Sequence, residues 1–177
     1  MVANTVKEVQ RLADALDKTS EEFGMRINIK KTKVMVISKG KTQKVAVYLH
    51  NEKLEQVTEF CYLGSMITAD ARCQKEIKRR IAMAKEAFNK RGELLRGSLS
   101  VELKKRMVKA LVWSVALYGS ETWTMTAEEV KRLEAFEMWI WRRMCRISWT
   151  DHITNEEVLR RVGEKRSLMQ TIRVRQK

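Results

Sequence analysis

The chain has 177 residues, of which 44% are hydrophobic and 33% are charged, and its formal net charge is +14. This composition supplies a core for one ordinary domain or two small ones and argues against a disordered chain. The three cysteines form no C-x-x-C pair and no histidine lies near a cysteine pair, so a disulfide framework and a zinc site are both disfavoured.

The hydropathy pattern indicates a chain without a membrane segment. The longest mostly apolar run, ALVWSVALYG at 110–119, is too short to cross a bilayer. The first residues, MVANTVKEVQ, lack the apolar stretch that a signal peptide needs. We therefore expect a cytoplasmic or nuclear protein with no membrane partner.

The first element expected along the chain is a helix at 5–23. Thr5 and Glu8 have the spacing of a capping box, which satisfies two free amides at a helix start. Apolar residues then recur at helical spacing, and Gly24 can adopt the left-handed conformation that ends such a helix.

Short strands are expected next, because apolar and polar residues alternate or short apolar runs occur. The segment VMVI is apolar on both faces, as in an interior strand, and Gly64 interrupts the last segment. The expected strands lie at 25–29, 34–37, 45–49 and 59–68, with a turn at 50–53 followed by a returning strand.

After Asp70 the pattern changes to long helices. Two further capping boxes are expected where Thr126 precedes Glu129 and where Thr154 precedes Glu157. The expected helices cover 71–91, a segment after Ser100, a segment from Thr126 to about Met144, and a segment from Thr154 to about Gly163, and the basic tail is compatible with a frayed helix. The predicted fold class is α+β, with a boundary near residue 70.

The basic residues are concentrated in one part of the chain. Residues 72–109 carry 13 basic and 4 acidic side chains, which is typical of a protein that binds a polyanion. Lys78, Ala82, Lys85 and Asn89 fall on one helix face, where small residues would let a phosphate backbone approach; a solvated lysine face is the alternative. The candidate nucleic-acid-binding residues are Lys75, Lys78, Arg79, Lys85, Lys104 and Lys105.

The chain offers no catalytic set of its own. It contains no G-x-S-x-G motif and no Walker loop, and its acidic residues lie mostly at helix starts and on helix faces. The five tryptophans could stack on bases, but core or interhelix contacts are the more usual role of such residues.

Three segments resemble parts of the reverse transcriptases of non-LTR retrotransposons, the long interspersed elements (LINEs). EEFGMRINIKKTKVMVIS resembles their fourth palm motif, motif D, with Gly24, Ile27, Asn28, Lys31 and Thr32 at the pattern positions. FCYLGSMIT resembles the next motif, motif E or the primer grip, and residues 116–159 resemble the thumb and post-thumb region.

The resemblance implies a role for particular residues. Lys31 matches the lysine proposed to protonate the departing pyrophosphate, and Tyr62, Leu63 and Gly64 match the grip that holds the primer end. The helices from 71 to about 118 match the thumb, which closes on the template–primer duplex. The implied domains are a partial palm at 1–69, thumb helices at 70–120 and a post-thumb helical region at 121–177.

The sequence also departs from the family pattern. The metal-binding aspartates of these polymerases, including their Asp-Asp hairpin, precede the helix equivalent to 5–23, and polymerase chemistry needs two metal ions. We therefore expect a fragment of an RNA-directed DNA polymerase that binds RNA–DNA hybrid or duplex but does not extend a primer alone. No cofactor or metal is expected in this chain, and Mg²⁺ only in the full-length enzyme.

The alternative is a non-enzymatic, element-derived module that binds another protein or itself, and a decayed fragment without a selected role is a third reading. In the complete palm, the strand at 34–37 would lie beside strands that this chain lacks. An exposed apolar edge of this kind invites pairing. We expect a second copy of the chain, or another partner, to cover it.

Overall fold

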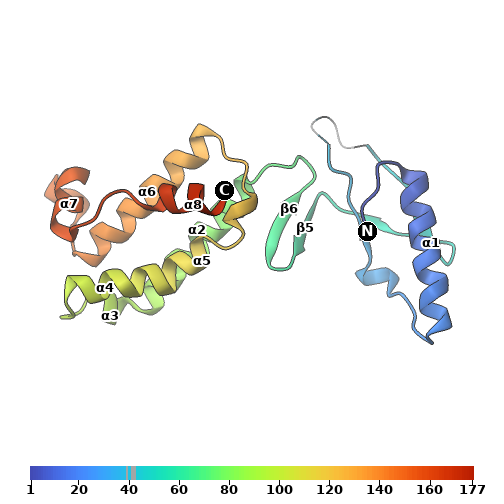
Figure 1. The fold of residues 1–177 in the computed structure, drawn as a ribbon, viewed down its shortest axis with the longest axis horizontal. Helices are drawn as coiled ribbons and strands as arrows, with labels where there is room; N and C mark the ends of the chain where they lie inside the picture. The colour runs from blue at the N-terminus through green and yellow to red at the C-terminus, as the bar shows by residue number, and fades with distance from the viewer. Residues whose placement is uncertain (39, 41–42) are drawn as a thin grey trace. The chain divides into compact units, whose positions relative to one another are not determined.

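The chain folds into two compact units, Met1–Arg72 and Cys73–Lys177. The computed structural model describes residues 1–38, 40 and 43–177. The first unit combines a long helix with short strands and the second is helical, which confirms the α+β class (Figure 1). No helix in the described residues is both long and apolar enough to cross a membrane.

The first unit begins with helix α1, Val6–Glu22. Its capping box forms as the sequence predicts: the Thr5 hydroxyl accepts the Glu8 amide and the Glu8 carboxylate accepts the Thr5 amide, each at 3.2 Å. After the helix, Gly24 adopts a φ of 68°, so the chain reverses where a left-handed residue was expected.

Six short strands follow in the described part of this unit: β1 (Lys33–Val34), β2 (Tyr48–Leu49), β3 (Glu52–Lys53), β4 (Glu55–Gln56), β5 (Glu59–Tyr62) and β6 (Ser65–Thr68). They form three two-stranded pairs, of which β2–β3 and β5–β6 are antiparallel and β1–β4 is parallel. The turn expected at 50–53 is confirmed only at His50 and Asn51, which both have positive φ as in the favoured two-residue hairpin turn, because Glu52 and Lys53 already form β3.

Some expected strands are wrong or too long. The segment 25–29 forms no strand, because the Asn28 side chain accepts the Lys31 amide at 3.0 Å and opens the 3₁₀ turn η1, Ile29–Lys31. The strand expected at 34–37 keeps only its first residue, in β1, and Ile37 is exposed rather than interior. The strand expected at 45–49 shortens to β2.

The core of the first unit is small. Its buried members are Ala13 of α1 together with Val47, Leu49 and Leu54 from the strand region. Gln10 adds a polar link, since its side chain accepts the Tyr48 amide at 2.9 Å and donates to the Tyr48 carbonyl at 2.8 Å. These contacts hold α1 against β2.

The second unit consists mainly of helices. The described segments are α2 (Gln74–Lys90), α3 (Gly92–Arg96), α4 (Val101–Val108), the π-helical turn η2 (Lys109–Trp113), α5 (Ser114–Ala116), the 3₁₀ turn η3 (Ser120–Thr122), α6 (Ala127–Met144), the 3₁₀ turn η4 (Trp149–Asp151), α7 (Asn155–Val162) and α8 (Leu168–Arg175). The expected starts are confirmed, with side chains of Ser100, Thr126 and Thr154 at the N-caps of α4, α6 and α7. The capping box at Thr126 is complete, whereas at α7 only the Thr154 hydroxyl cap forms, because the Glu157 carboxylate pairs with Arg160 and Arg161 instead.

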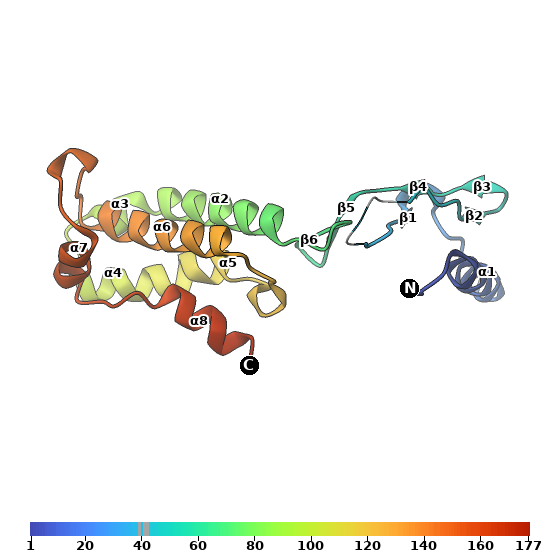
Figure 2. The same cartoon turned by 90° about the horizontal axis from the view of Figure 1, so that it is seen from above.

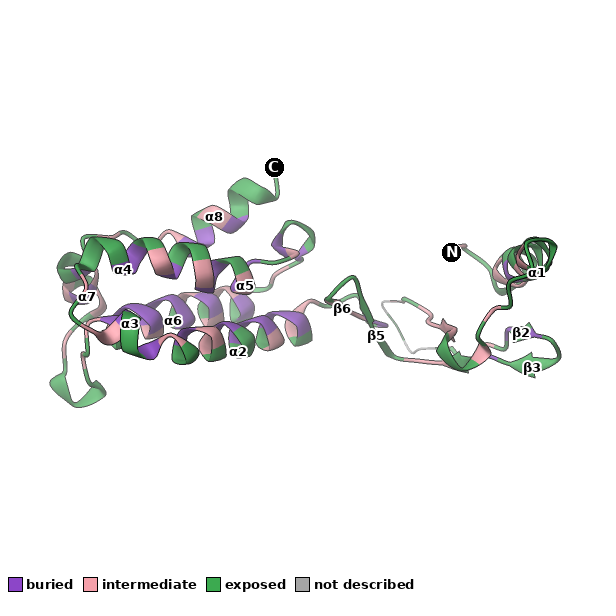
Figure 3. Ribbon diagram, turned by 90° about the horizontal axis from the view of Figure 1, so that it is seen from below, coloured by how far each residue is buried: buried purple, intermediate pink, exposed green. Residues whose placement is uncertain are grey.

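The helices of the second unit share one apolar core. α2 packs against α5 and α6, and α6 also packs against α7 and α8, as Figures 1 and 2 show. Figure 3 shows buried positions on the facing sides of these helices. The buried core includes Phe88, Leu133 and Trp141. The basic tail forms α8, whose Leu168 and Ile172 are fully buried. Residue 120, the expected border between thumb and post-thumb, lies within this one unit.

Candidate nucleic-acid interface

The outer face of α2 presents the basic residues singled out in the sequence. Lys75, Lys78, Ala82 and Asn89 are exposed, and Lys85 is half-buried. The opposite face buries its apolar residues in the core: Ile77, Ile81, Ala84 and Phe88. The core therefore fixes α2 with its lysine face toward solvent.

A tryptophan connects this face to α6. The Lys85 ammonium lies 5.1 Å from the ring centre of Trp139, and the Arg143 guanidinium lies 5.2 Å from the same ring. Cations at this distance are attracted to the face of an indole. The basic surface thus continues from α2 to Arg143, a residue that the sequence interpretation missed although its spacing from Trp139 is that of one helical turn.

Lys104 and Lys105 of α4 are placed differently from the α2 lysines. Both are buried, and the Lys104 ammonium donates to the Gly97 carbonyl at 2.7 Å. Lys105 pairs with Glu102 at 2.8 Å and with Glu164 at 3.6 Å, and the hydrogen bond that its ammonium donates to the Glu102 carboxylate raises the pKa of Lys105. Their charges are used inside the unit, and we leave both out of the interface proposed below.

Arg79 also has an internal partner. Its guanidinium donates to Glu76 at 3.1 Å, and Arg80 donates to the other oxygen of Glu76 at 2.6 Å. Glu76 is buried in α2, so these two arginines compensate its charge. Arg79 therefore has less freedom than Lys78 to contact a phosphate.

The candidate residues of the first unit lie in two exposed turns. Lys31 ends η1 with its side chain exposed. Leu63 and Gly64 form the two-residue turn between β5 and β6, with φ values of 47° and 79°, and Tyr62 precedes them. Leu63 and Tyr62 are 74% and 57% exposed, so the hairpin end offers an apolar surface to a partner.

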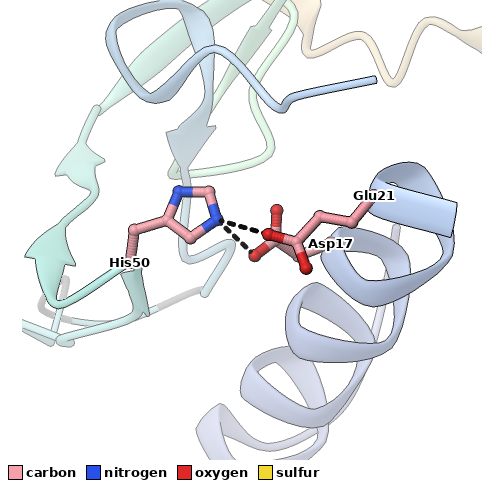
Figure 4. A group of neighbouring side chains, drawn as sticks. All are labelled: Asp17, Glu21 and His50. Carbon is pink, nitrogen blue, oxygen red and sulfur yellow. Dashed lines mark ion pairs between the residues drawn. The ribbon is translucent and has the colours of Figure 1, made fainter. Parts of the chain in front are cut away.

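A cluster of three ionisable residues was not anticipated from the sequence. Asp17 and Glu21 lie one turn apart on α1, and His50 reaches them from the turn between β2 and β3 (Figure 4). The His50 Nε2 atom lies 2.7 Å from Asp17 and 3.7 Å from Glu21. The spacing suits an ion pair that fastens the hairpin to the helix. The four-residue spacing of Asp17 and Glu21 was the only sign of this cluster in the sequence, since His50 is far away along the chain.

Four of the five tryptophans have the core or interhelix role that the sequence interpretation favoured. Trp113, Trp123 and Trp141 are buried, and Trp139 packs edge-on against Phe88 with ring centres 5.4 Å apart. Trp149 is the exception at 88% exposure.

The chain is similar to a known protein of transposon origin. No family model and no solved structure match the chain. The chain is 27% identical over 152 residues to an uncharacterized transposon-derived protein of Caenorhabditis elegans, and the match covers 85% of the chain. It covers 54% of the relative, so the chain spans about half the length of the curated protein it matches. The similarity supports an origin in a transposable element.

Proposed function

We propose that the chain is part of an RNA-directed DNA polymerase of a non-LTR retrotransposon and that it binds template–primer duplex. The observation that carries the binding is the lysine face of α2, which the core holds toward solvent. Lysine contacts to phosphates give affinity without sequence choice. The transposon-derived relative supports an origin in a transposable element, and the motif resemblance is the reason for assigning the chain to the element's polymerase.

The proposed part binds but does not catalyse. The 177 residues contain no adjacent pair of aspartates, and the family's metal site uses such a pair. Lys31 and the turn at 62–64 would serve only in a complete palm, in which Mg²⁺ is held by residues outside these motifs. A primer-extension assay with Mg²⁺ or Mn²⁺ tests this, and DNA synthesis by the purified chain would contradict it.

The duplex interface is tested by removing two lysines. Lys78→Ala with Lys85→Ala should weaken binding to a labelled RNA–DNA hybrid, and the slope of log affinity against log salt should fall by about two, one for each lost phosphate contact. Fluorescence anisotropy between about 50 and 200 mM salt measures both the affinity and its salt slope. Over this range the affinity of a protein with several phosphate contacts falls about a thousand-fold.

The control is a double variant with the same loss of charge, Lys131→Ala with Lys165→Ala. Both residues are exposed and lie outside α2. If this control and the α2 variant weaken binding equally, net charge rather than the α2 face is responsible, and the interface is wrong.

A protein-binding module is the second candidate function, and the first unit motivates it. Several large apolar side chains are exposed there: Phe23, Met25, Ile37, Tyr62 and Leu63. Such a surface commonly marks a contact with a second copy or another protein. Sedimentation at several protein concentrations distinguishes self-association from binding to another protein. A monomer at all concentrations would count against self-association.

A further inference from the structure

The second unit has an open hollow with an unusual lining. Its volume is about 590 Å³, and it lies where α3 and the end of α6 come together. The lining residues are Gly92, Glu93, Arg96, Arg143, Arg146, Ile147 and Ser148. Three arginines therefore face one carboxylate, which makes the hollow a site for an anion.

The three guanidinium groups remain available for a ligand. Among the described residues none of them forms an ion pair with a carboxylate: Arg96 donates to the Gly92 carbonyl at 3.2 Å, Arg146 donates to the Arg96 carbonyl at 2.7 Å, and Arg143 lies over Trp139. The hydrogen bonds of Arg96 and Arg146 use only their Nε atoms, and Arg143 contacts the face of the Trp139 ring. The Arg96 guanidinium packs against Gly92, whereas the terminal amines of Arg143 and Arg146 can hold a phosphate in the fork that arginine presents.

The end of α6 places Arg146 in the left-handed conformation. The Ile147 amide donates to the Arg142 carbonyl at 2.9 Å, which closes a Schellman-type end, and Arg146 takes the left-handed position at φ 57°. Glycine occupies this position without strain in most helices. An arginine costs about 1 kcal/mol more here, and such strain is typical of functional positions.

An exposed tryptophan follows the hollow directly. Ser148 lines the hollow, and Trp149, the next residue, is 88% exposed. The turn is held firmly: the Ser148 amide donates to Asp151 at 2.7 Å and the Ser148 hydroxyl accepts the Thr150 amide at 3.3 Å. An indole presented to solvent by an ordered turn is a platform on which a base can stack.

We propose that this hollow binds single-stranded nucleic acid, with phosphates on Arg96, Arg143 and Arg146 and a base stacked on Trp149. The site rests on the proposed function and extends it. Because Arg143 shares Trp139 with Lys85 of the α2 face, the strand can pass from the duplex surface to the hollow. Paired bases are already stacked on one another, so Trp149 selects unpaired nucleotides over duplex.

The test compares the binding of two labelled ligands to the full chain: a 15-nucleotide oligothymidine and an RNA–DNA hybrid of the same length. This length is about that of one binding site for single-stranded nucleic acid. Trp149→Ala should weaken oligothymidine binding about ten-fold, whereas Trp149→Phe, which keeps a stacking ring, should lose about three-fold or less. Neither change should alter hybrid affinity by more than about two-fold, because no base of the duplex stacks on Trp149.

The arginines are tested with a charge-matched control. Arg143→Ala with Arg146→Ala should weaken oligothymidine binding about ten-fold or more, and Arg173→Ala with Lys177→Ala about two-fold or less. Arg173 and Lys177 are exposed at the C-terminal helix and do not line the hollow. Circular dichroism of each variant shows that the helices remain.

The outcomes separate this site from the proposed function. One outcome is that Trp149→Ala binds oligothymidine like the wild type while the double variant Lys78→Ala with Lys85→Ala still binds the RNA–DNA hybrid more weakly. The single-strand site in the hollow is then wrong, and the α2 interface stands. If the wild type binds neither ligand, both proposals fail. If Trp149→Ala changes only the sedimentation of the chain, the tryptophan contacts protein, and the single-strand site is overturned.

Discussion

Lys105 is a residue whose sequence and structural interpretations lead to different experiments. In the sequence it belongs to a basic run on an expected helix, and that pattern favours a phosphate contact. In the structure its stem is buried and its ammonium lies between Glu102 and Glu164. The charge therefore stabilises the contact between α4 and the segment after α7.

We expect Lys105→Ala to lower the free energy of unfolding by about 1–2 kcal/mol, because both the packing of the stem and the bonds of the ammonium are lost. Lys105→Met keeps the stem and should cost about half as much. Urea denaturation measures both. Affinity for an RNA–DNA hybrid should change less than about two-fold in either variant, because the ammonium is already paired with Glu102 and Glu164.

The neighbouring Arg106 is exposed and provides the matched control. Arg106→Ala should change the free energy of unfolding by less than about 0.5 kcal/mol. Loss of hybrid binding in Lys105→Met without loss of stability would contradict the structural role.

Individual residues differ in how far their environment can be predicted. The Thr5 and Thr126 caps follow from contacts three residues apart, so the sequence contains all the information. The hollow could not be predicted in this way, because Arg96 and Arg146 are 50 residues apart and meet only after α3 packs beside α6. Trp149 could not be separated from the core tryptophans for the same reason.

At the scale of elements, helices were more predictable than strands. A helix such as α6 repeats its apolar spacing over 18 residues, and its start is marked by a cap. The strands are two to four residues long, too short for alternation to identify them. A local hydrogen bond from the Lys31 amide to the Asn28 side chain is sufficient to replace the strand expected at 25–29 with a 3₁₀ turn.

The contact between α6 and α8 contains a buried carboxylate. Glu137 of α6 is fully buried, and its Oε1 accepts the amides of Ser167 and Leu168 at 3.0 and 3.2 Å. Burial raises the pKa of Glu137 above 4.5, although these amides and the Trp141 side chain act in the opposite direction. The carboxyl therefore links the start of α8 to the core at an electrostatic cost once it is ionised.

This raised pKa predicts a pH dependence. Below pH 4.5, the unfolded-state value, Glu137 is protonated in both states and the cost is absent; as the pH rises through the folded-state pKa, stability is lost. Glu137→Gln keeps an acceptor oxygen for both amides and never ionises. The wild type should therefore lose stability relative to this variant as the pH rises above 4.5.

Urea denaturation of both proteins at several pH values gives the difference in unfolding free energy. Other titrating groups, such as Glu157, whose pKa is lowered to about 2 by Arg160 and Arg161, are common to both and cancel in the difference. A difference that stays constant across this range would show that Glu137 is not the group responsible.

At the scale of the whole molecule, the change of pattern near residue 70 was visible in the sequence because short strand signals give way to helical spacing. The structure divides the chain between Arg72 and Cys73. The unity of the second part was not predictable from local patterns, since residues from α2 to α8 meet in one core through contacts distant in sequence.

The two cores predict independent folding of the second unit. All described buried residues of the larger core lie in 73–177, whereas in the described part of the first unit the smaller core buries Ala13, Val47, Leu49 and Leu54. A chain of 73–177 alone should therefore keep its helical circular dichroism and unfold within about 3 °C of the upper transition of the full chain. Residues 1–72 should account for a separate transition at lower temperature, because so small a core supports little stability. Scanning calorimetry of both chains measures this, and a single transition in the full chain with loss of helix in the fragment would contradict it.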